Sequence, residues 1–130
     1  MTHKIAQFLE ERRPATPCLV FDLDVVEENY ADIRRAMPDA HIYYAVKANP
    51  APEILARLAS LGSRFDTASV AEIRMALAAG ALPEHISFGN TIKKQVDIAT
   101  AYALGVRLYA FDSEAELNKL AESAPGSQVF

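Results

Sequence analysis

The sequence predicts an α/β protein in which short β-strands alternate with α-helices around a parallel sheet. Five apolar, strand-like runs begin at residues 42, 64, 86, 107 and 128, so they recur every 21 or 22 residues. Helix-length segments with one apolar face lie between these runs. Strands that alternate with helices of this length favour βαβ units with right-handed crossovers. A series of such units forms either a barrel or a doubly wound parallel sheet. No Gly-x-Gly-x-x-Gly follows the first strand, which argues against a dinucleotide-binding sheet.

The segment before this repeat is expected to begin with an amphipathic helix over residues 3–13. Two prolines end that helix and lead into an extended apolar run over residues 18–23. Asp24 fits as the N-cap of the next helix, with Glu27 at its third position as an acidic variant of the capping box.

The repeat itself has recognisable helix starts and stops. Ser69 and Ser113 each follow a strand and have a glutamate three residues later, Glu72 and Glu116, which is the capping-box spacing. Glycines stand where the helices should stop, at positions 62, 80 and 105. The predicted strands cover residues 42–47, 64–67, 86–89, 107–112 and 128–130.

Composition excludes several classes of protein. Half of the 130 residues are hydrophobic and the net charge is −4, so the chain has a globular composition without a basic stripe for nucleic acid. No apolar run reaches the ~20 residues that span a bilayer, and the charged start lacks the apolar core of a signal peptide. A single cysteine, Cys18, and three scattered histidines indicate neither a disulfide nor a metal site. A cytoplasmic location is therefore expected.

The strongest candidate for chemistry is Lys47. The strand over residues 42–47 carries it to its carboxyl end, and Asn49-Pro50 breaks the strand directly afterwards. Chemistry in α/β barrels takes place at the carboxyl ends of parallel strands. The alternative is a solvated lysine whose stem lies along apolar surface.

The segment Tyr44-Ala45-Val46-Lys47-Ala48-Asn49, continued by Ile54-Leu55, Leu58 and Gly62, resembles the pyridoxal phosphate (PLP) lysine signature of the ornithine/diaminopimelate/arginine decarboxylases. The resemblance implies the N-terminal part of a (β/α)8 TIM-type, alanine-racemase-like barrel. It also implies that Lys47 forms a Schiff base with PLP and later helps to protonate the carbanion left by loss of CO2. The residues after Lys47 differ from those of alanine racemases.

Asp66 is the second candidate. The run Phe65-Asp66-Thr67-Ala68-Ser69 resembles the family segment in which an aspartate lies close to the PLP lysine, and a nearby carboxylate would favour the charged lysine. As an alternative, Asp66 could cap the following helix, although Ser69 fits that position better. Glu72 is explained by its capping box and is left out of the site.

Two further segments carry the resemblance. The turn from Asn90 to Lys93 resembles an Asn-x-x-Lys turn at the barrel mouth; without the resemblance, Lys93 and Lys94 would be solvated charges. Residues 109–117 resemble the Phe-Asp-Ser-Glu-x-Glu-Leu run of ornithine decarboxylases and look structural. The implied function is PLP-dependent decarboxylation of a basic amino acid, L-ornithine to putrescine in polyamine biosynthesis, by a homodimer. The alternatives are a diaminopimelate or lysine decarboxylase, or a non-catalytic, decarboxylase-like regulatory binding protein.

Length sets the expected domain organisation. A (β/α)8 barrel takes ~250 residues, and this chain holds four βα units and the start of a fifth strand. Residues 1–16 are expected to form a lead segment and residues 17–130 the first half of the barrel. We expect the phosphate loop, the partner of the pyridine nitrogen and the substrate pocket to lie in later parts of a longer protein. These 130 residues alone are then expected neither to bind PLP tightly nor to decarboxylate an amino acid.

Overall fold

Five parallel strands form the centre of the molecule, a computed structural model that describes residues 1–130. The strands lie side by side in the order in which they occur in the chain. They are β1 (Tyr43–Ala45), β2 (Arg64–Thr67), β3 (Ile86–Phe88), β4 (Leu108–Tyr109) and β5 (Gln128–Val129). Only β1 and β5 have an unpaired edge.

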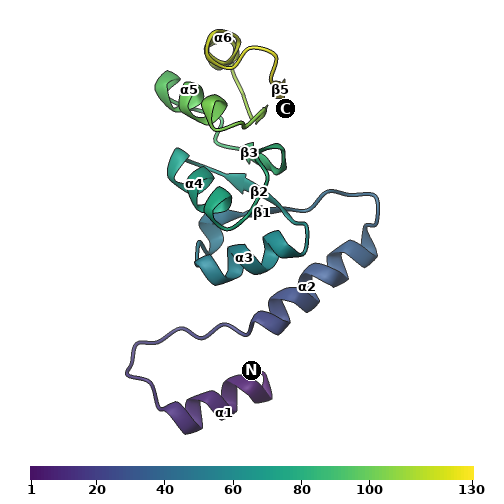
Figure 1. Cartoon of the computed structure of the whole chain (residues 1–130), viewed down its shortest axis with the longest axis vertical. Coiled ribbons are helices and arrows are strands. Elements are labelled where there is room, and N and C mark those ends of the chain that lie inside the picture. Colours follow the sequence, from purple (N-terminus) through teal and green to yellow (C-terminus); the bar gives the residue numbers. More distant parts are fainter.

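Four helices cover one side of this sheet, and each packs against the next along the chain (Figure 1). They are α3 (Pro52–Ser60), α4 (Val70–Ala78), α5 (Gln95–Ala103) and α6 (Glu114–Ser123). Sequential parallel strands with all crossover helices on one side are the arrangement of a curling barrel, because a doubly wound sheet has helices on both faces. The predicted fold class is confirmed as a parallel α/β arrangement of barrel type.

Alternation along the strands separates the core from the open face of the sheet. Phe65 of β2 and Ile86 of β3 are fully buried and belong to one hydrophobic core with Ile73 of α4 and Ile98 of α5. Asp66 follows Phe65, so its side chain points to the opposite face. The helix side of the sheet is therefore the core, and Asp66 and Ser87 face the open side.

The first helices are α1 (His3–Arg12) and α2 (Leu23–Ala36), which lie at the end of the molecule away from the C-terminus (Figure 1). The helix predicted over residues 3–13 is confirmed. The extended run predicted over residues 18–23 pairs with no strand, and its Leu19 side chain is 80% exposed.

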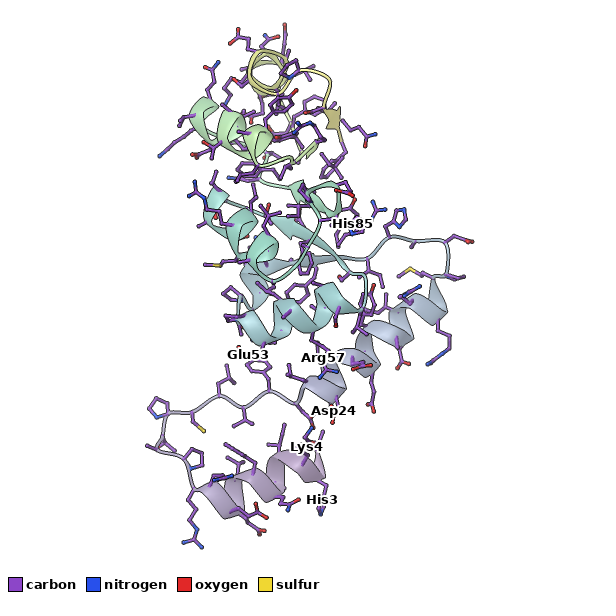
Figure 2. The ribbon with its side chains drawn as sticks, viewed as in Figure 1. His3, Lys4, Asp24, Glu53, Arg57 and His85 are labelled. Carbon is purple, nitrogen blue, oxygen red and sulfur yellow. The ribbon has the colours of Figure 1, made fainter.

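The start of α2 was predicted wrongly. Its N-cap is Asp22, whose carboxylate accepts a hydrogen bond from the Asp24 amide at 3.2 Å. Contacts with α1 decide this: the Thr2 hydroxyl donates to Asp22 at 2.8 Å and holds the pKa of that carboxyl below its usual range. Asp24 instead forms an ion pair with Lys4 at 2.6 Å, and Figure 2 shows the two side chains meeting between the helices.

Glu27 was likewise assigned to the wrong partner. It does not complete a capping box on α2 but forms an ion pair with Arg57 of α3 at 2.7 Å. This pair joins the N-terminal helices to the sheet-covering layer. No helix in the structure is long and apolar enough to cross a lipid bilayer.

Candidate functional site

Lys47 lies in a 3-10 turn, η1 (Val46–Ala48), rather than in the strand that was predicted to continue to residue 47. Two features fix this turn. Val46 is fully buried, and the Tyr44 hydroxyl donates a hydrogen bond to the carbonyl oxygen of Asn49 at 3.1 Å. Burial raises the pKa of Tyr44, so its hydroxyl remains a donor at neutral pH. A rigid turn thus presents an exposed Lys47 at the carboxyl end of β1.

Asp66 lies on the neighbouring strand and faces the open side of the sheet. Its carboxylate oxygen Oδ1 accepts a hydrogen bond from the Ser87 hydroxyl of β3 at 2.7 Å. The backbone of Gly89 passes so close that a Cβ atom there would lie 2.1 Å from the same oxygen. A side chain at position 89 would displace the Asp66 carboxylate, which occupies that space.

Lys47 and Asp66 line one pocket of about 190 Å³ at this edge of the sheet. The other residues that line it are Ala45, Ala68, Glu72, Gly89, Asn90 and Thr91. Lys47 takes part in none of the six ion pairs in the molecule, so its amine is available to a ligand. A larger hollow of about 500 Å³ on the open face of the sheet also includes Asp66 and Gly89.

Glu72 belongs to the pocket although sequence reasoning left it out. Ser69 rather than Asp66 caps α4, as predicted, since its hydroxyl accepts from the Glu72 amide at 3.2 Å. The Glu72 carboxylate also accepts from the Ala68 amide at 2.8 Å, at the wall of the pocket. The position of Glu72 in the sequence could have indicated its place in the pocket. The first turn of a helix that directly follows a strand lies at the carboxyl edge of the sheet.

Lys93 is buried, which corrects the interpretation of Lys93 as a solvated charge. Its Nζ atom donates to the carbonyl oxygens of Asn90 at 2.8 Å and Ala110 at 2.6 Å, and lies 2.9 Å from Glu116 Oε1. The ammonium also lies 5.6 Å from the centre of the Phe88 ring. Lys94, its neighbour, is exposed as expected.

The Glu116 carboxylate binds Lys93 and Lys119 rather than the backbone at the start of its own helix. Burial alone raises the pKa of its carboxyl, but hydrogen bonds from Lys119 and Lys93 and the charge of Lys93 together hold the pKa below its usual range. Ser113 caps α6 as predicted, since its hydroxyl accepts from the Glu116 amide at 3.3 Å, but the return bond of a capping box is not formed because the Glu116 carboxylate binds Lys93 and Lys119 instead.

This shift predicts acid sensitivity. Because the pKa of Glu116 is lower in the folded than in the unfolded protein, the unfolded state binds more protons, and stability is lost as pH falls below about 4.5 through the folded pKa. Urea unfolding at a series of pH values should show a smaller acid-side loss for Glu116→Gln than for the wild type. Parallel pH curves for the two proteins would contradict the assignment.

The histidines lie apart from the pocket. Figure 2 shows His3 on α1 and His85 beside the sheet, on separate parts of the molecule. No group of three or more His, Cys, Asp or Glu side chains is arranged to hold a metal ion.

The fold and the pocket define an α/β-barrel type of protein that presents a free lysine beside carboxylates at the carboxyl ends of its strands. Residues 23–130 match the family model described as pyridoxal-dependent decarboxylase, pyridoxal binding domain. The chain belongs to this family.

Relatives and a solved structure agree with the family match. The chain is 41% identical over 129 residues to a lysine/ornithine decarboxylase of Selenomonas ruminantium, covering 99% of the chain and 33% of that protein. It is 39% identical over 125 residues to a chloroplastic ornithine decarboxylase of Nicotiana glauca, covering 96% and 28%. Antizyme inhibitor 2 of Xenopus laevis is 36% identical over 110 residues, covering 85% and 24%.

The crystal structure of the Selenomonas ruminantium lysine decarboxylase superposes with a TM-score of 0.89 at 40% identity, covering 100% of this chain and 34% of that one. A complex of this enzyme type with PLP and cadaverine matches with the same TM-score. The chain therefore spans about a quarter to a third of the length of these relatives.

The pocket residues fit the reactive end of a pyridoxal group. The lysine amine is free of ion pairs, and carboxylates from β2 and α4 line the same pocket. Lys47 is also the one basic side chain among the pocket residues, so a phosphate group finds no second cation among them.

Proposed function

We propose that this chain is the PLP-carrying part of a basic amino-acid decarboxylase and that Lys47 is its cofactor lysine. The observation that carries the proposal is the ion-pair-free Lys47 in a pocket shared with Asp66. When bound, PLP supplies an aldehyde for a lysine amine and an electron sink for bond cleavage.

The residues of this chain have distinct roles in the proposal. Lys47 holds the cofactor through its amine and carries a proton at Nζ after the cofactor has been released from it. Asp66, oriented by the Ser87 hydroxyl, places a carboxylate in the same pocket as the Lys47 amine. The Tyr44 hydroxyl keeps the Lys47 turn in place through the Asn49 carbonyl.

The substrate of the proposal is L-ornithine, converted to putrescine in polyamine biosynthesis. The run over residues 109–117 and the relatives that are ornithine decarboxylases support ornithine. Lysine is the closest competitor, since another relative is a lysine/ornithine decarboxylase. Measuring the rate of CO2 release by the complete protein from ornithine, lysine and diaminopimelate would show which of the three is the preferred substrate.

The decisive experiment is borohydride trapping. The complete protein, incubated with PLP and reduced, is expected to carry one phosphopyridoxyl group, and peptide mapping is expected to locate it on Lys47. The absorbance band of the imine should disappear on reduction. An adduct on another lysine, or no adduct, would contradict the proposal.

A second candidate is a non-catalytic regulatory protein, which the similarity to antizyme inhibitor 2 favours. A pure binding protein has no chemical need for both Lys47 and Asp66 in one pocket, so the enzyme remains the leading proposal. Trapped PLP on Lys47 together with substrate turnover would exclude the second candidate.

The proposal also includes the architecture of the complete protein. The unpaired edges of β1 and β5 and the one-third coverage of the relatives support residues 17–130 as the first half of a barrel completed by further strands. A cytoplasmic homodimer belongs to the same proposal, and sedimentation and cell fractionation test it. The isolated 130 residues are proposed to retain no PLP after gel filtration.

A further inference from the structure

The buried ion pair between Lys93 and Glu116 lies next to the pocket, and neither residue has a role in the proposed function. Lys93, in the turn before α5, is 4% exposed, and Glu116, in the first turn of α6, is 2% exposed. A lysine ammonium has three N–H donors, and all three have partners here: the carbonyls of Asn90 and Ala110 and the Glu116 carboxylate. Lys93 is therefore saturated and has no donor left for a ligand.

Glu116 is equally well bound. Its Oε1 atom also accepts the backbone amide of Lys93 at 3.1 Å, and its Oε2 atom pairs with Lys119 at 2.5 Å. The pair thus joins the turn after β3, the end of β4 and the start of α6. All three are junctions at the carboxyl edge of the sheet, where the pocket lies.

The turn that Lys93 holds is one wall of the pocket. Gly89, Asn90 and Thr91 line it, and Lys93 binds the Asn90 carbonyl directly. Gly89 in turn lies against the Asp66 carboxylate, with no room for even a Cβ atom between them. A shift of this wall toward β2 would therefore press on the Asp66 carboxylate.

Stability alone does not account for such a pair. Burying two charges costs much of what their attraction returns, and apolar residues of similar volume often replace buried ion pairs without loss of stability. A charged pair does, however, restrict geometry, because it tolerates only one arrangement of its hydrogen bonds.

We propose that Lys93 and Glu116 are positioning residues that fix the Gly89–Thr91 wall of the pocket and, through Gly89, the place of Asp66 beside Lys47. Neither residue lines the pocket, so neither is catalytic. The inference rests on the proposed function, since it assigns the pair to the same site.

The test compares the double variant Lys93→Met/Glu116→Leu with the wild-type complete protein. The apolar pair fills similar space but leaves the Lys93 amide and the Ala110 carbonyl without their partners, so the protein is expected to fold with a moderately lower urea midpoint. Amide hydrogen exchange across residues 89–94 is expected to accelerate. The value of kcat is expected to fall about tenfold to a hundredfold with a smaller change in KM, and the pH profile of kcat to shift, because misplacement by about 1 Å costs rates of this size.

Glu27→Gln is the control, because it breaks an ion pair between neighbouring elements, Glu27 of α2 with Arg57 of α3, and no residue of either helix lines the pocket. It is expected to leave kcat and exchange at residues 89–94 unchanged. Unchanged exchange in the double variant would overturn the inference, as would faster exchange with an unchanged kcat and pH profile. If the wild type decarboxylates nothing, the proposed function fails and the assignment of the pair to catalysis fails with it. Hydrogen exchange would then still decide whether the pair holds the turn.

Discussion

Lys47→Arg and Lys47→Ala are each expected to lower the decarboxylation rate of the complete protein by at least about 10²- to 10⁴-fold, the range for loss of one positioned acid–base group. No other pocket residue carries an amine. The arginine variant keeps the positive charge, but a guanidinium is not deprotonated in proteins and does not replace a nucleophilic amine. Equal losses in the two variants would therefore assign the effect to the amine rather than to its charge.

Lys94→Ala is the control for these variants. Lys94 is an exposed lysine that does not line the pocket, and its substitution is expected to leave the rate unchanged. The rates are measured as released CO2, and borohydride-trapped PLP is measured in parallel. A Lys47→Ala protein with more than a tenth of the wild-type rate would rule out the assigned role.

Gly89→Ala is expected to destabilise the protein and to abolish its retention of PLP. The new Cβ atom would lie 2.1 Å from Asp66 Oδ1 and 2.7 Å from its Cγ, well inside the 3.4 Å of ordinary contact, so the carboxylate or the backbone has to shift. Overpacking of this kind costs about 1–3 kcal/mol. The cost is expected as a lower urea midpoint, together with loss of retained PLP.

The double variant Gly89→Ala/Asp66→Ala separates the two consequences. Removing the carboxylate makes room for the Cβ atom, so the urea midpoint is expected to recover toward that of Asp66→Ala alone. Decarboxylation is expected to stay low, since Asp66 is missing from the pocket. Failure of the midpoint to recover would show that the contact with Asp66 is not the reason for glycine at position 89.

Much of the fold could be predicted because its signals are local. The strand over residues 64–67 and the helix starts at Ser69 and Ser113 depend on side chains within three or four positions, and the structure confirms them. The carboxyl-edge positions of Lys47 and Asp66 could also be predicted, since parallel strands end at one edge. Their assigned roles remain predictions.

The errors share a different physical cause. Asp22 rather than Asp24 caps α2 because Thr2 and Lys4 approach from α1, twenty residues away in the chain. Glu27 was predicted to complete a capping box on α2, but its carboxylate pairs with Arg57, thirty residues away. Local spacing contains no information about such partners, so it assigned each carboxylate to its nearest helix end.

The sequence by itself determined the class of protein: the 21- to 22-residue repeat specifies a parallel α/β arrangement, and the segment around Lys47 specifies the pyridoxal family. Only the tertiary structure decided which charges are buried and what surrounds the pocket. Lys93 looks like a solvated charge in the sequence, but folding places it against Glu116, twenty-three residues away, where burial requires that each charge have a partner. The same packing brings Gly89 against Asp66, a contact that no local pattern encodes.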